Sequence, residues 1–131
     1  MEDERIPNVV RDSFAFSNLI GQDRWKTWTP VATGMTEVGV ATYSGRLHLV
    51  GAQCFFQVKI VAATSTASTQ GTTFLSLPLL AKGFGGDGYA YNSTSLTLLG
   101  GCAFDIANNR FTPPTWAATG NEIVITGWFE V

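Results

Sequence analysis

The sequence predicts an all-β domain of antiparallel strands, and its composition gives three reasons. Residues that favour strands are abundant: threonine, valine and isoleucine number 32 of 131, and there are 16 aromatic residues. Glutamate, lysine, arginine and glutamine, which favour helices, total only 17. Fourteen glycines and five prolines interrupt the chain at short intervals. Short strands separated by such residues are typical of a sandwich or a barrel.

The charge of the chain limits its partners. Only 14% of the residues are charged, against about 25% in an average soluble domain, while 45% are hydrophobic. Such a neutral surface predicts that identical subunits or a larger assembly cover part of it. The net charge of −2 argues against a nucleic-acid partner, which would require a clustered positive face. The length of 131 residues suits one domain.

Residues 1–24 differ from the rest and are predicted to form an extended arm, with a short helical turn near 14–20 as the alternative. Six of the first 12 residues are charged and Pro7 interrupts them, a pattern unlike a signal peptide. A partner could bury the spaced apolar side chains of this segment. These candidate partner-binding residues are Ile6, Val9, Val10, Phe14 and Phe16.

The predicted sandwich covers residues 25–131 and begins with three strand regions. Residues 25–33 and 36–43 are expected to be short strands separated by Gly34. Residues 46–62 alternate apolar and polar side chains near their end, as a half-buried strand does. Gly51 marks a bulge or bend within this region.

Loops and shorter strands are expected to follow. The polar residues 63–72 predict a loop, and the glycine-rich residues 83–88 predict another. Residues 73–79 predict a strand in which Pro78 marks either the end or an edge position. Asn108 and Asn109 predict a tight turn, and Pro113 and Pro114 stiffen the segment after it. The remaining strands are expected at 89–91, 95–99, 101–106 and 122–130.

The closing strand is apolar on both faces. Ile123, Ile125 and Phe129 alternate with a second set that includes Val124 and Trp128. Such a strand is either central in a sandwich or buried against a neighbouring subunit.

The sequence shows no pattern of residues for catalysis, a metal or a cofactor. His48 is the only histidine, lies between two leucines and is expected on the polar face of a strand. Nothing in the sequence indicates that Asp87 and Asp105 form a pair for general acid–base catalysis. Cys54 and Cys102 lie in apolar contexts and are expected to be buried free thiols, with a disulfide between them left open. No enzymatic activity is predicted.

Four tryptophans are the most informative large side chains: Trp25, Trp28, Trp116 and Trp128. Large aromatic rings contribute most to cores and subunit interfaces, and this is the favoured interpretation. An indole also stacks on the apolar face of a sugar ring, so a carbohydrate platform is the alternative.

Several motifs together resemble a small β-sandwich of tailed bacteriophages, found at the carboxyl ends of tail fibres and in head-decorating proteins. They are Trp25-x-x-Trp28-Thr29-Pro30, Tyr43 and Gly45 before a hydrophobic strand, Ser76-Leu77-Pro78, Gly100-Gly101 and Ile125-x-Gly127-x-Phe129. The resemblance implies an antiparallel jelly-roll-like β-sandwich, a homotrimer and a non-enzymatic role in the virion. It supplies no fixed set of functional residues.

The resemblance leaves two functions open. A tail-fibre tip needs a long shaft before it, whereas only about 24 residues precede the predicted sandwich. The leading hypothesis is therefore a capsid decoration protein, which docks on the major capsid protein or another virion protein through its arm. The alternative is a receptor-binding tail-fibre or baseplate tip that recognises host-surface carbohydrate. A free-standing lectin is a third possibility and would need exposed aromatic residues. No membrane partner is expected.

Overall fold

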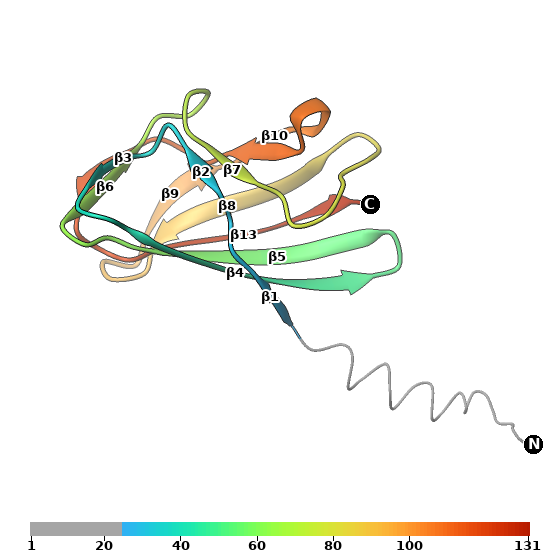
Figure 1. Ribbon diagram of the computed structural model, residues 1–131, viewed down its shortest axis with the longest axis horizontal. Coiled ribbons are helices and arrows are strands. Elements are labelled where there is room, and N and C mark those ends of the chain that lie inside the picture. Colours follow the sequence, from blue (N-terminus) through green and yellow to red (C-terminus); the bar gives the residue numbers. More distant parts are fainter. Residues whose placement is uncertain (1–24) are drawn as a thin grey trace, which may run out of the picture.

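The computed structural model describes residues 25–131, which form antiparallel β-sheets arranged as a sandwich (Figure 1). The predicted arm, residues 1–24 with its apolar side chains, lies outside the described residues. No helix of the described part is long and apolar enough to cross a membrane. The prediction of an antiparallel all-β fold is confirmed, and the jelly-roll connectivity stays a prediction.

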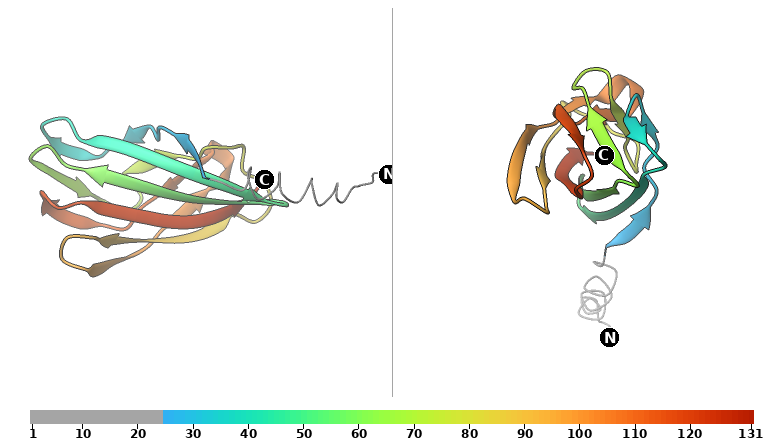
Figure 2. Two further views of the ribbon diagram at one scale, coloured as in Figure 1. Left: turned by 90° about the horizontal axis from the view of Figure 1, so that it is seen from below. Right: turned by 90° about the vertical axis from the view of Figure 1, so that its left-hand side faces the viewer.

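One layer is a six-stranded sheet, and two smaller sheets face it (Figure 2). In spatial order, the six strands are β1 (Lys26–Trp28), β4 (Thr42–Val50), β5 (Gln53–Val61), β13 (Ile123–Glu130), β8 (Gly86–Asn92) and β9 (Thr97–Gly101). The four-stranded sheet contains β10 (Ala103–Asp105), β11 (Arg110–Thr112), β7 (Phe74–Ser76) and β2 (Ala32–Thr33). The three-stranded sheet contains β12 (Trp116–Thr119), β6 (Ser65–Ser68) and β3 (Thr36–Val38).

Phe56 on β5 lies at the centre of the core between the layers. Its ring contacts those of Trp28, Phe104, Phe111 and Phe129, at centroid distances of 5.2 to 6.2 Å. These partners come from both layers, so one aromatic cluster connects the two layers of the sandwich. Packing of this kind stabilises a fold beyond the burial of apolar area alone.

The closing strand β13 is central in its sheet, between β5 and β8. Ile123, Ile125 and Phe129 are fully buried, whereas Val124 and Trp128 on the opposite face are half-buried. The first of the two alternatives for an apolar strand therefore holds: its position is central.

Gly51 lies in the turn between β4 and β5, where its φ is 58°. The expected single region 46–62 is thus a hairpin. Asn109, also with positive φ (54°), follows a 3-10 turn at Ile106–Asn108, which confirms the tight turn predicted there. Pro78 lies outside β7, which ends at Ser76.

The prediction of a loop at 63–72 is wrong, because residues Ser65–Ser68 of this segment form strand β6. Thr66 and Ser68 are buried on this strand, so it alternates like a half-buried strand but with small polar side chains on its inner face. Strands β11 and β12 were also missed, because each is short and gains its stability from pairing with distant partners.

The predicted loop at 83–88 is also wrong in part, because β8 begins at Gly86. A Cβ at Gly86 would lie 2.0 Å from the Trp128 carbonyl oxygen, and one at Gly88 would lie 2.8 Å from the Thr126 carbonyl oxygen. The glycines therefore serve a close approach of strand backbones rather than a flexible loop.

Candidate binding face on the six-stranded sheet

The six-stranded sheet has one face in the core and one face toward solvent. Successive side chains of a strand point to opposite faces, so every second residue of β4, β5, β13 and β8 points outward. We call this set the outer face: Ser44, Arg46, His48, Phe55, Gln57, Lys59, Asp87, Tyr89, Tyr91, Val124, Thr126 and Trp128.

Strand register places these side chains in rows across the sheet. One row contains His48, Phe55, Trp128 and Asp87, which are direct partners on neighbouring strands. The next contains Arg46, Gln57, Thr126 and Tyr89, and a third contains Ser44, Lys59, Val124 and Tyr91. Aromatic groups and polar groups therefore lie side by side over a continuous area.

Contacts within the outer face fix several of its polar and aromatic groups. The Arg46 Nε donates a hydrogen bond to Gln57 Oε1 over 2.8 Å, and Nη2 donates to the same oxygen. The Arg46 guanidinium also lies over the Trp25 ring, 4.8 Å from its centroid. Trp25 in turn makes an edge contact with His48, with ring centroids 5.5 Å apart.

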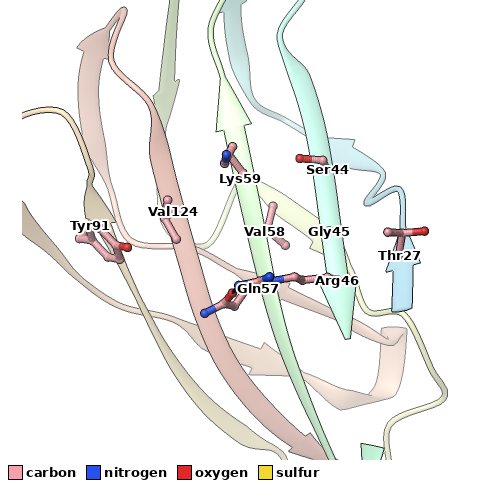
Figure 3. Close-up of a pocket in the computed structure, with 9 residues that line it drawn as sticks. All are labelled: Thr27, Ser44, Gly45, Arg46, Gln57, Val58, Lys59, Tyr91 and Val124. Atoms are coloured by element: carbon pink, nitrogen blue, oxygen red, sulfur yellow. Dashed lines mark hydrogen bonds between the residues drawn. The ribbon is translucent and has the colours of Figure 1, made fainter. Parts of the chain in front are cut away.

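The outer face is hollowed at two neighbouring places. A groove of about 480 Å³ runs over β1, β4, β5, β13 and β8 (Figure 3). Its outward side chains are Thr27, Ser44, Arg46, Gln57, Lys59, Tyr91 and Val124. A second hollow of about 250 Å³ lies beside Phe55, Asp87, Tyr89, Thr126 and Trp128. Both are open depressions, which suits an extended ligand.

Glu122 lies at the border of the groove and is held in place. Its Oε2 lies 3.6 Å from Lys59 Nζ, and its Oε1 accepts a hydrogen bond from Ser93 Oγ over 2.7 Å. The hydrogen bond from Ser93, with a smaller contribution from Lys59, lowers the pKa of this carboxyl. Glu122 therefore stays ionised at neutral pH.

Comparison with protein-family models, with curated proteins and with solved structures finds no match to this chain. The function must therefore be argued from the outer face itself.

The four predicted tryptophans lie in two different environments. Trp116 is 5% exposed and its Nε1 donates to Thr66 Oγ1 over 3.3 Å, within the core. Trp28 packs against the core and covers Gly45. The half-buried Trp128 belongs to the outer face, and Trp25, at 38% exposed, packs against Arg46 and His48 of that face.

The residues considered for chemistry are dispersed. His48 lies on the outward side of β4, as predicted. Asp87 Oδ1 accepts from the Gly88 amide, and Asp105 Oδ2 accepts from Arg110 Nε over 2.9 Å. No group of three or more histidine, cysteine, aspartate or glutamate residues that could hold a metal occurs within residues 25–131.

Cys54 and Cys102 are free thiols, and Cys54 is buried. Burial raises the pKa of Cys54 to about 11. Burial and the nearby negative charge of Asp87 raise the pKa of Cys102 to about 12. Both thiols are therefore protonated at neutral pH and are poor nucleophiles.

Sequence reasoning missed the polar and tyrosine members of the outer face: Arg46, Gln57, Tyr89 and Tyr91. The alternation of apolar and polar residues in 46–62 and the Tyr-Ala-Tyr pattern at 89–91 indicate that these side chains share the outward side of their strands. Only the order of strands, however, places β8 beside β13 and thereby brings these side chains together.

Proposed function

We propose that this chain is a non-enzymatic binding module of a bacteriophage virion, and that it recognises host-surface carbohydrate through the outer face. The proposal rests on one observation: partly exposed aromatic rings lie beside polar side chains that hydrogen bonds hold in place, across two adjoining hollows. Sugar rings need this combination, because their C–H faces stack on aromatic rings while their hydroxyl groups require directional hydrogen-bonding partners.

The outer face supports this receptor-binding function better than attachment to a capsid. An interface with a large protein buries anchors in a continuous apolar centre with a polar rim. On the outer face, polar Gln57 and Thr126 lie in the middle, with aromatic Trp128, Tyr89 and Tyr91 around them. Capsid decoration through residues 1–24 stays a prediction, and a virion attachment through that segment is compatible with a sugar-binding outer face.

The test is binding of the full chain to an array of bacterial surface polysaccharides. The parent protein should bind at least one polysaccharide, and Trp128→Ala should weaken that binding at least tenfold. The matched control is Leu96→Ala, which removes an 83% exposed apolar side chain in the β8–β9 turn, away from the outer face. Circular dichroism should show that both variants fold.

Binding to phage heads without binding to any polysaccharide would support capsid decoration instead. Equal sugar binding by Trp128→Ala and by the parent would place recognition elsewhere on the molecule.

A further inference from the structure

The groove in Figure 3 has a chemical character that the second hollow lacks. Among residues 25–131, its charged lining side chains are Arg46 and Lys59, both basic, and no carboxylate of this part of the chain lines it. The second hollow is lined by Asp87, and no basic residue of the described part of the chain lines it. The two parts of the outer face therefore prefer ligand groups of different charge.

We propose that the groove binds an acidic sugar, meaning a pyranose that carries a carboxylate, with Arg46 and Lys59 as the residues that receive the carboxylate. This inference rests on the proposed function and names the class of carbohydrate. Tyr91 supplies the stacking surface, and the neighbouring hollow around Trp128 receives the next, neutral sugar of the chain.

Arg46 is held in a position to bind an anion. Gln57 Oε1 accepts hydrogen bonds from its Nε and Nη2, and the Trp25 ring lies beneath the guanidinium. These contacts use only part of the donor set of the side chain. Because the guanidinium is already ordered, less side-chain entropy is lost when a carboxylate binds.

Gln57 adds a donor for a neutral sugar oxygen. Its carbonyl oxygen is engaged by Arg46, and in Figure 3 its amide nitrogen points away from Arg46, toward β13. Thr126 lies beside Gln57 on β13, in the direction of the second hollow. A ligand that crosses from one hollow to the other therefore meets polar groups along its path.

Lys59 remains able to bind an anion although Glu122 is near. The Nζ to Oε2 distance is 3.6 Å, and the two side chains are 55% and 35% exposed. An exposed pair at this distance is weak, and an ammonium group has three donors. Ser93 also anchors Glu122, so the carboxylate is held at the border rather than in the groove.

Tyr91 and Val124 form the apolar part of the groove. They are direct partners on β8 and β13, and Figure 3 shows the Tyr91 side chain extending toward β13. The Tyr91 ring also contacts the Tyr89 ring, with centroids 6.4 Å apart. The ring is thereby supported on one side, which favours stacking of a ligand on its open surface.

The test measures the affinity of the full chain for defined oligosaccharides. Each oligosaccharide is titrated into the protein, and binding is measured by tryptophan fluorescence and by calorimetry. The acidic probes are sialyllactose and a disaccharide of glucuronic acid linked to galactose, which place a neutral sugar beside the acidic one and distinguish a uronic acid from a sialic acid as the source of the carboxylate. Lactose and the corresponding glucose–galactose disaccharide are the neutral counterparts. At least one acidic probe should bind at least tenfold more tightly than its neutral counterpart, and added salt should reduce the difference.

Two variants and one control define the residues. Arg46→Gln and Lys59→Gln should each weaken binding of the acidic probe at least fivefold and weaken binding of the neutral counterpart by a clearly smaller factor. Lys82→Gln, the same change of charge at an exposed residue outside the groove, should leave both unchanged.

The contrary results distinguish failure of the preference for acidic sugars from failure of the proposed carbohydrate binding. Equal binding of acidic and neutral probes, with loss of both in Trp128→Ala, would overturn the preference for acidic sugars and leave the proposed function standing. Absence of binding to these probes and to the polysaccharide array would overturn both.

Discussion

At the scale of single residues, one contact between a glycine and a tryptophan holds the first strand of the sandwich. A Cβ built on Gly45 would lie 2.6 Å from two ring carbons of Trp28, so the indole lies directly on the β4 backbone. Trp28 also makes an edge contact with Phe56, with ring centroids 6.2 Å apart. The indole therefore connects edge strand β1 to the centre of the core.

Gly45→Ala is expected to lower the free energy of unfolding by about 1–3 kcal/mol, because the new methyl group overpacks the indole. Gly101→Ala is the control, since a Cβ there meets nothing closer than 3.7 Å. Trp28→Ala should itself cost about 3–5 kcal/mol, and His48→Ala less than about 1 kcal/mol.

Chemical denaturation of the double variant Trp28→Ala/Gly45→Ala tests whether this contact is the reason for the glycine. Without the indole, Gly45→Ala should cost almost nothing, so the two changes are not additive. Additive costs would mean that the glycine is required for a reason other than this contact.

The two thiols predict a loss of stability at alkaline pH. The folded-state pKa values, about 11 for Cys54 and about 12 for Cys102, lie above the ordinary value of 9.0. The unfolded chain therefore releases these protons first as the pH rises. The stabilising contribution is complete below pH 9 and is lost as the pH rises through the folded-state values.

Urea denaturation at several pH values from 7 to 11 checks this prediction. The free energy of unfolding of the parent should decline above pH 9, and the double variant Cys54→Ala/Cys102→Ala should decline less steeply over the same range. Burial and Glu37 also raise the pKa of Tyr43, which adds a further loss above pH 10 in both proteins. Identical slopes would show that the thiols do not titrate differently on folding.

At the scale of elements, the sequence predicted strands where apolar and polar residues alternate and failed where small polar residues form the buried side. The apolar periodicity located the β5 part of the region 46–62 and the closing strand β13, whereas the turn at Gly51 that divides this region into β4 and β5 was expected only as a bulge or bend. Strand β6 was missed because its buried residues, Thr66 and Ser68, have the composition of a loop. Hydrophobic periodicity cannot detect a strand whose inner side chains are hydroxyls.

The candidate site was predictable only in part for a related reason. Because side chains alternate along a strand, Arg46 and Gln57 must each point to the face opposite to that of their apolar neighbours. It does not show that β13 lies between β5 and β8, which brings Tyr91 into the same groove. Strand order depends on long-range packing, so the tryptophans were recognised as important but could not be divided between core and outer face.

Strand β6 provides a test with two variants of similar size. Thr66 Oγ1 accepts the hydrogen bond from the Trp116 indole, whereas Ser68 Oγ is buried without a hydrogen-bond partner among the described residues. Thr66→Val should cost about 1–3 kcal/mol, because it leaves the indole N–H buried and unsatisfied. Ser68→Ala should be neutral or stabilising, because it removes an unsatisfied group.

Thermal and urea denaturation of the two variants measure this difference. A larger loss in Ser68→Ala than in Thr66→Val would mean that the serine hydroxyl has a stabilising role and that the indole hydrogen bond is unimportant.

At the scale of the whole molecule, the arm and the sandwich are expected to have separable roles. Residues 25–131 contain a continuous core around Phe56. A chain beginning at Trp25 should therefore fold and bind sugars like the full chain, yet fail to reattach to phage particles stripped of the protein. Calorimetry and particle pull-down measure the two properties. A truncated chain that does not fold would mean that the domain boundary is wrong.

The last prediction is a homotrimer that leaves the outer face open. Several large apolar side chains are strongly exposed on edges, loops and turns away from the outer face: Val31, Val38, Val40, Leu80, Phe84 and Leu96. With only 14% charged residues, the chain has few charges to keep such surfaces in solution.

Burying ~400 Å² of apolar surface per subunit would contribute about 10 kcal/mol before the costs of association. Light scattering should therefore give three times the chain mass of 14.1 kDa for the parent and for Trp128→Ala. A monomer would contradict the prediction from composition. A parent trimer that dissociates in Trp128→Ala would identify the outer face as the subunit interface, and the sugar-binding proposal would then fail because the trimer would cover its site.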